Sequence, residues 1–139
     1  MLGRLRLLGL LAVGVASSVC TGCIPAGPKI VATPNNVMVN STVKLAGSGF
    51  PASKTIEIEE CGATSWVVMA TPCDAAGAVN VKTSSTGAFS AQFKMLVCPL
   101  VGPPPVPITA RTCYVGEPVL SGVDTDRLAG AAKVVVTYP

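Results

Sequence analysis

Histidine is absent from the 139 residues, aromatic residues make up only 4% of them and charged residues only 12%. Without histidine the chain cannot build a Ser-His-Asp triad, a histidine general base or a histidine-ligated zinc site. Among the carboxylates that remain, alternation in a strand-like stretch puts Glu57 and Glu59 on one solvated face, with Glu60 beside them. Charge patterning explains this group without catalysis. We therefore expect a protein that is not an enzyme, with no catalytic residue, no metal and no cofactor.

An excess of charge of one sign is also lacking. The sequence has ten basic and seven acidic residues. Arg4 and Arg6, near its start, are two of the ten, so the rest of the chain carries eight basic residues against seven acidic ones. A nucleic-acid-binding domain usually presents a basic patch or stripe, and the sequence contains no basic cluster of that kind. Direct binding to nucleic acid is therefore not expected.

The most hydrophobic run lies at the start of the chain and is short for a membrane span. Arg4 and Arg6 precede an apolar stretch at residues 7–16, and small residues continue to Ser18. A transmembrane helix needs roughly 20 apolar residues. A positive start, a short apolar run and then small residues are the order found in a secretory signal peptide. We assign residues 1–22 to a signal peptide and expect export.

Two cysteines, Cys20 and Cys23, stand at the end of this segment in the sequence CTGC. The stretch resembles a bacterial lipobox, in which a small residue precedes a cysteine that is lipidated and becomes the new N-terminus. Cys20 departs from that pattern, since a leucine is usual there. We expect lipidation at Cys23 and attachment to a membrane surface, with residues 23–28 as a Pro/Gly tether. The alternative is cleavage after Ser18 and release as a secreted protein.

Six cysteines become four if Cys20 leaves with the signal peptide and Cys23 carries the lipid. An even number in an exported chain favours disulfides, and four cysteines allow three pairings. The local pairing is favoured because each bridge closes a single loop, which is worth on the order of 3 kcal/mol. A zinc site is the other interpretation, but the close spacing of zinc ligands is missing. The expected bridges are Cys61–Cys73 and Cys98–Cys113.

Apolar and polar residues alternate along most of the remaining chain, which predicts β-strands. In residues 88–96, for example, the pattern places Phe89, Ala91, Phe93 and Met95 on the inner face. A turn with Gly87 at positive φ is expected just before this strand. Strands are predicted at residues 42–47, 55–61, 79–83, 88–96 and 131–138, and more weakly at 29–33, 66–69 and 113–116. Seven or eight short strands without a helical stripe predict an all-β, immunoglobulin-like sandwich over residues 29–139.

Four stretches carry a family resemblance in the same order along the chain. They are VKLAGSGFPASKTIEIEEC (43–61), SSTGAFSAQF (84–93), CYVGEPV (113–119) and GAAKVVVTY (130–138). Together they resemble the neocarzinostatin family over most of residues 29–138. The resemblance implies a seven-stranded immunoglobulin-like sandwich with two local disulfides. For the best-known members it also implies an actinobacterial apoprotein that holds an enediyne chromophore in a cleft and delivers it to DNA.

The positions that match the family's chromophore cleft depart from the family pattern. Glu59 stands where the family has a glycine, Ala78 lies near an aromatic position, and Pro118 replaces a polar residue. An aromatic ligand requires apolar and aromatic walls, so we expect the scaffold without the chromophore site. Trp66 and Met69, from the loop between Cys61 and Cys73, complete the candidate ligand cleft, although Trp66 equally suits a strand packed on the core.

Two further loops have features that suggest contacts. Residues 100–111 contain four prolines, which predict a stiff polyproline II segment that serves either as a contact surface or as protection of a sheet edge. The stretch Asp124-Thr125-Asp126 is only a weak indication of a cation site.

The sequence as a whole predicts an exported, lipid-anchored, non-enzymatic binding protein. Its expected partners are the membrane, through the lipid, and either an apolar small molecule in the cleft or a protein at the disulfide-bounded loops. The alternative is a soluble secreted apoprotein that carries an enediyne-like antibiotic chromophore acting on DNA.

Overall fold

The computed structural model describes residues 26–62, 73–96, 98, 109–119 and 127–139. The strands are β1 (Lys29–Thr33), β2 (Asn36–Met38), β3 (Thr42–Ser48), β4 (Thr55–Cys61), β5 (Val79–Lys82), β6 (Phe89–Lys94), β7 (Ala110–Val119) and β8 (Arg127–Thr137), with one 3₁₀ turn, η1 (Ala75–Gly77). Within these ranges, no helix is long and apolar enough to cross a membrane. The predicted strand at residues 66–69 lies outside the described residues.

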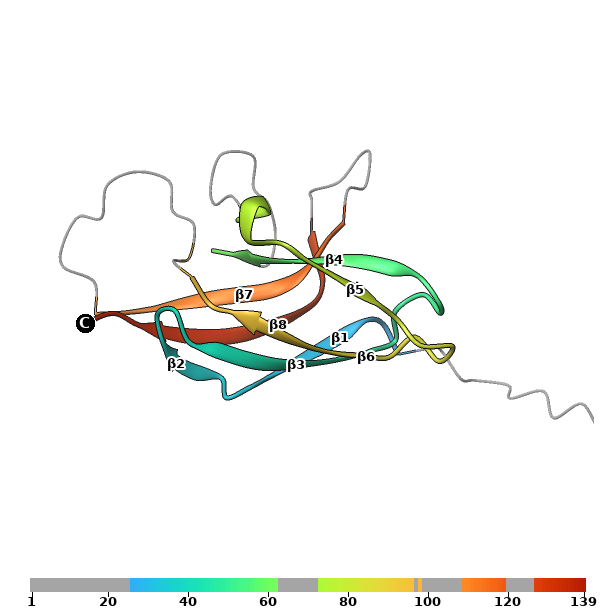
Figure 1. The fold of residues 1–139 in the computed structure, drawn as a ribbon, viewed down its shortest axis with the longest axis horizontal. Coiled ribbons are helices and arrows are strands. Elements are labelled where there is room, and N and C mark those ends of the chain that lie inside the picture. The colour runs from blue at the N-terminus through green and yellow to red at the C-terminus, as the bar shows by residue number, and fades with distance from the viewer. Residues whose placement is uncertain (1–25, 63–72, 97, 99–108, 120–126) are drawn as a thin grey trace, which may run out of the picture.

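The strands form a sandwich in which the first and last strands of the hydrogen-bonded order lie close to each other. Hydrogen-bonded neighbours follow the order β5-β4-β7-β8-β1-β3-β6, and β2 pairs with β8 outside this path. In Figure 1, β4 and β7 lie along one side of the body, β1 and β3 along the other, and β8 lies between them. The first and last strands of the path, β5 and β6, are in contact. The all-β, seven-stranded sandwich is therefore confirmed, and β2 is a short additional strand.

The core follows the alternation predicted from the sequence. In β3, Val43 and Leu45 are fully buried, and they pair across the sheet with Phe93 and Ala91 of β6. Phe93 and the neighbouring Met95 are buried as well. The two neighbouring strands therefore place their apolar rows side by side on the inner face of the sheet. Burial there contributes roughly 25 cal/mol per Å² of apolar surface removed from water.

The predicted turn before β6 is confirmed. Gly87 has a φ of 74°, a conformation that favours glycine, and a Cβ at this position would clash with the carbonyl oxygen of Phe50. The Ser84 hydroxyl accepts hydrogen bonds from the backbone N–H groups of Thr86 at 3.2 Å and Ala88 at 3.1 Å. The turn thus satisfies its own backbone donors and brings β5 next to β6.

Strand β7 is longer than the predicted segment 113–116. It pairs antiparallel with β8 almost from end to end, with a register shift between Val115 and Glu117. On its other side it pairs with β4, where Glu59 lies opposite Gly116. A register shift of this kind bends a strand and redirects its side chains. Since β7 runs antiparallel to β4 with Gly116 opposite Glu59, Glu117 and Pro118 continue toward the first half of β4.

Candidate functional site

Strand β4 carries adjacent carboxyl groups toward opposite faces of the sheet. The inner row consists of Ile56, Ile58 and Glu60, and Glu60 is only 1% exposed. Glu57, on the outer row, is exposed as predicted, but Glu59 on the same row is only 7% exposed. The prediction that Glu59 lies on a solvated face is therefore wrong.

The cover over Glu59 comes from chain that returns to the end of β4. Cys73 forms an isolated bridge with Cys61, and the backbone N–H of Asp74 donates a 2.8 Å hydrogen bond to the carbonyl oxygen of Glu60. Strand β7 lies on the remaining side of β4. The end of β4 is therefore flanked on both edges, and the sulfurs of Cys61 and Cys73 lie within 4.8 Å of the Glu59 carboxylate.

A cavity of about 370 Å³ lies at this point and is called here the β4–β7 cavity. Its walls come from β4 (Thr55, Ile56, Glu57, Glu59), the returning segment (Cys73, Ala75) and β7 (Glu117, Pro118). Its volume is within the range of roughly 300–1,000 Å³ that is common for small-molecule sites. Three of its eight lining residues are glutamates, so the cavity is acidic as well as partly apolar.

The acidic groups of this cavity hold their protons more tightly than free glutamate does. Burial, followed by the neighbouring charges of Glu57 and Asp74, raises the pKa of Glu59 above its ordinary value of 4.5. Burial alone raises the pKa of Glu117. In both cases the cause is the loss of water around the carboxylate. The cavity therefore places carboxylates where their negative charge lacks full hydration.

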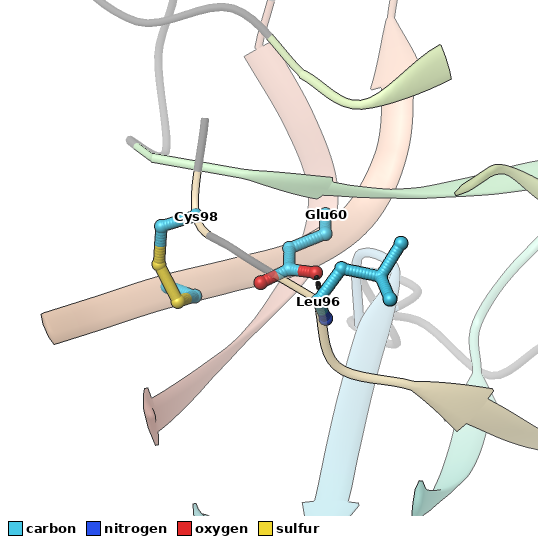
Figure 2. The surroundings of a disulfide bond; sticks show 4 residues. Glu60, Leu96 and Cys98 are labelled. Atoms are coloured by element: carbon cyan, nitrogen blue, oxygen red, sulfur yellow. Dashed lines mark hydrogen bonds between the residues drawn. A yellow bond between two sulfur atoms is a disulfide. The ribbon is translucent and has the colours of Figure 1, made fainter. Parts of the chain in front are cut away.

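On the other face of β4, Glu60 lies in the core beside a disulfide (Figure 2). One carboxyl oxygen, Oε2, accepts a 2.8 Å hydrogen bond from the backbone N–H of Leu96. The other, Oε1, is buried and has no hydrogen-bond partner among the described residues. Burial raises the pKa of Glu60, the Leu96 hydrogen bond opposes this in part, and the charge of Asp74 adds to it. Glu60 is thus a core carboxyl satisfied on one side only.

Both local disulfides are present, Cys61–Cys73 and Cys98–Cys113. Each lies beside a glutamate. The Glu59 carboxylate and the sulfurs of Cys61 and Cys73 lie within 4.8 Å of one another, and so do the Glu60 carboxylate and the sulfurs of Cys98 and Cys113. Thiolates, not disulfide sulfurs, are the usual cysteine ligands of metals. In the oxidised protein these two groups therefore offer only a single carboxylate each to a metal ion.

The residues of the predicted cleft are only partly brought together. Glu59 and Pro118 line the β4–β7 cavity, whereas Ala78, the residue after η1, is half-buried and is not among the lining residues. Trp66 and Met69 lie outside the described residues, as do Asp124–Asp126 and the prolines of the loop at residues 100–108. The cleft as a whole stays a prediction.

Sequence reasoning missed the place of Glu117 and the burial of Glu60, and only the second had a signal in the sequence. Glu117 had none until the β7 register was known, because its place depends on the irregularity at Val115/Glu117. Glu60 had one, since it shares parity with Ile56 and Ile58 and residues i, i+2 and i+4 line one face of a strand. The arrangement offers no nucleophile paired with a base among the described residues. What it offers is a walled, acidic recess suited to binding.

Comparison with known proteins yields a structural relationship alone. No family model matches the chain, and no curated protein matches it in sequence. A solved structure of macromomycin aligns with it at a TM-score of 0.53 and 20% sequence identity, covering 81% of this chain and 99% of the macromomycin chain. At that identity the likeness concerns the course of the backbone and leaves function to the site. The protein thus has the neocarzinostatin-like all-β fold that its sequence motifs indicated.

Proposed function

We propose that this protein is an exported, lipid-anchored, non-enzymatic binding protein that takes a small organic ligand in the β4–β7 cavity. The observation that carries the proposal is a recess with a buried carboxyl group on its wall, built on a rigid sheet. The two disulfides support a location outside the cytoplasm, where such bonds persist. The shared fold with macromomycin supports a binding role by analogy alone.

The membrane anchor rests on the CTGC stretch and is tested by intact mass spectrometry of the native protein extracted from membranes. We expect a chain that begins at Cys23, carries added acyl mass and has its four remaining cysteines oxidised. A soluble chain that begins at Val19, with all six cysteines retained, would overturn the anchor. That outcome would leave the cavity and its binding role to be judged by the next experiment.

Blocking the cavity should abolish ligand binding. Ala75 is exposed in η1 and lines the cavity, while its neighbour Ala76 is equally exposed and does not. We expect indole, used as a neutral probe, to shift amide NMR signals of β4 and β7 residues. Ala75→Trp should weaken that binding by at least about tenfold, because displacing some 60 Å² of apolar ligand contact removes about 1.5 kcal/mol.

The matched control is Ala76→Trp, which adds the same side chain one residue away. It should bind indole as the unaltered protein does. Equal binding by both variants would show that the probe sits elsewhere and would contradict the assignment of the cavity as the binding site.

The carrier of an enediyne-like chromophore is the second candidate, favoured by the macromomycin fold. The departures from the family's cleft pattern at Glu59 and Pro118, both of which line this recess, weigh against it. If the protein isolated from its native source carries a bound chromophore that absorbs in the near ultraviolet, the chromophore carrier becomes the first candidate.

A further inference from the structure

The charge of the β4–β7 cavity is one-sided. Glu57, Glu59 and Glu117 line it, and no lysine or arginine is among the lining residues. Lys82 of β5 pairs with Thr55, four residues before Glu59 along β4, and is not part of the wall. In the described part of the chain, no ion pair offsets these three carboxylates. The recess therefore presents negative charge to whatever enters it.

Glu59 is the buried carboxyl group on the wall of this cavity. It is 7% exposed and lies on the cavity wall, and no hydrogen bond joins its side chain to another described residue. Burial and the charges of Glu57 and Asp74 act on it in the same direction, against ionisation. A carboxylate partly withdrawn from water and placed beside like charges is stabilised by a nearby positive charge. A positive group placed in the cavity would supply that charge.

The remaining wall specifies the rest of the ligand. Ala75 and Pro118 are apolar and line the same recess as the carboxylates. A hydrated inorganic ion gains nothing from such surfaces, whereas an organic cation can bury its carbon skeleton against them while its charged group meets the glutamates.

We propose that the β4–β7 cavity binds a small organic ammonium ion, with its charged nitrogen beside Glu59 and Glu117 and its apolar body against Ala75 and Pro118. This inference rests on the proposed binding function and gives the chemical class of its ligand. It also reverses one expectation drawn from the sequence, in which the candidate ligand was simply apolar.

The test uses three probes that share one indole ring and differ in charge: tryptamine, tryptophol and indole-3-acetate. Each is titrated into the full mature protein at neutral pH, with binding followed by isothermal titration calorimetry and by amide NMR shifts in β4 and β7. Charges about 4 Å apart near a protein surface interact strongly enough for at least tenfold discrimination. We therefore expect tryptamine to bind on the order of tenfold or more tightly than tryptophol, and indole-3-acetate more weakly than both.

Substitutions then locate the charge effect. Glu59→Gln and Glu117→Gln should each reduce the preference for tryptamine over tryptophol by a factor of about three or more, while tryptophol binding changes little. Ser90→Lys serves as the control, because it raises the net charge by the same amount on an exposed position of β6, away from the cavity lining. It should keep the preference intact.

Each remaining outcome decides a different point. If the three probes bind at the cavity equally well, the binding function stands and the ammonium inference is overturned. If none of them shifts a residue of the cavity, both are overturned. If Ca²⁺ or Zn²⁺, at a concentration equal to that of the protein, shifts the NMR signals of the same residues and displaces tryptamine, the site belongs to an inorganic cation. The organic ligand class is then wrong.

Discussion

Replacing both Cys98 and Cys113 by alanine should lower the free energy of unfolding by about 3 kcal/mol or more. The bridge spans 15 residues of sequence, and closing a loop of that size removes about 3 kcal/mol of conformational freedom from the unfolded chain. Both cysteines are also almost fully buried, at 1% and 0% exposed, so their loss leaves a gap in the core. Since small domains are stable by only about 5–15 kcal/mol, the variant should unfold at a much lower urea concentration.

The other disulfide provides a matched comparison. Cys61–Cys73 spans 12 residues, so its loop term is nearly the same, but Cys73 is only partly buried. Cys61→Ala/Cys73→Ala should therefore lose less stability than the first double variant, by the amount that core packing contributes. Urea denaturation followed by circular dichroism measures both. A loss under about 1 kcal/mol for Cys98→Ala/Cys113→Ala would contradict the structural role given to this bridge.

The stability that Glu59, Glu60 and Glu117 contribute should be largest below about pH 4.5 and should fall as the pH rises through their raised folded-state pKa values. The folded-state pKa values of Glu59, Glu60 and Glu117 are all raised above the ordinary 4.5. A group of this kind binds its proton more tightly in the folded state, so its contribution is fully present below about pH 4.5 and is lost as the pH passes through the raised folded value. Thermal unfolding measured from pH 4 to pH 8 should show this decline.

Glu60 should account for a large part of that decline. It is the most buried of the three carboxyls, and its Oε1 has no partner in the described core (Figure 2). Glu60→Gln keeps an oxygen that can accept the hydrogen bond from Leu96 and removes the titration. At pH 8 the variant should be more stable than the unaltered protein by about 1–3 kcal/mol, because it replaces a buried, unpaired charge with a neutral group, and an unsatisfied charged group costs more than a neutral one.

At pH 4 this difference should vanish or reverse, because protonated Glu60 is already neutral and the substitution no longer removes a buried charge. Glu57→Gln is the control: it removes a carboxylate from the exposed position of the same strand. Most of the pH dependence should survive that change, since burial is the largest cause of the raised pKa of both Glu59 and Glu60. Parallel stability curves for Glu60→Gln and the unaltered protein would contradict this role for Glu60.

Much of the fold could be predicted because strand alternation and turn chemistry act locally. The rows Val43/Leu45 and Phe89/Phe93 repeat with the period of a strand, and the structure buries them as expected. Strand β2 was missed because three residues, Asn36–Met38, are too few to establish a period. The full length of β7 was missed because Gly116 and Pro118 interrupt a pattern that pairing with β4 and β8 sustains.

The candidate site could be predicted only in part, and Glu59 and Pro118 show why. Both were placed in a cleft by family resemblance, and both line the β4–β7 cavity. Their partner Glu117 lies on a different strand and reaches the same recess only through the register of β7 on β4. Such a contact depends on pairing between residues almost 60 positions apart, which no local pattern records.

The sequence by itself determined the all-β class, the inner row of each main strand, the turn at Gly87 and the two local disulfides, since each depends on neighbouring residues or on a count of cysteines. Tertiary structure alone decided which glutamates of β4 are hydrated. Alternation assigns Glu59 and Glu60 to opposite faces, but it does not say what covers each face. On the outer face, Glu59 lies against the Cys61–Cys73 disulfide, which the returning chain brings to the end of β4. On the inner face, Glu60 lies in the core beside the Cys98–Cys113 bridge. Burial is a property of neighbours brought from elsewhere in the chain, and so the acidic recess appears only in the folded molecule.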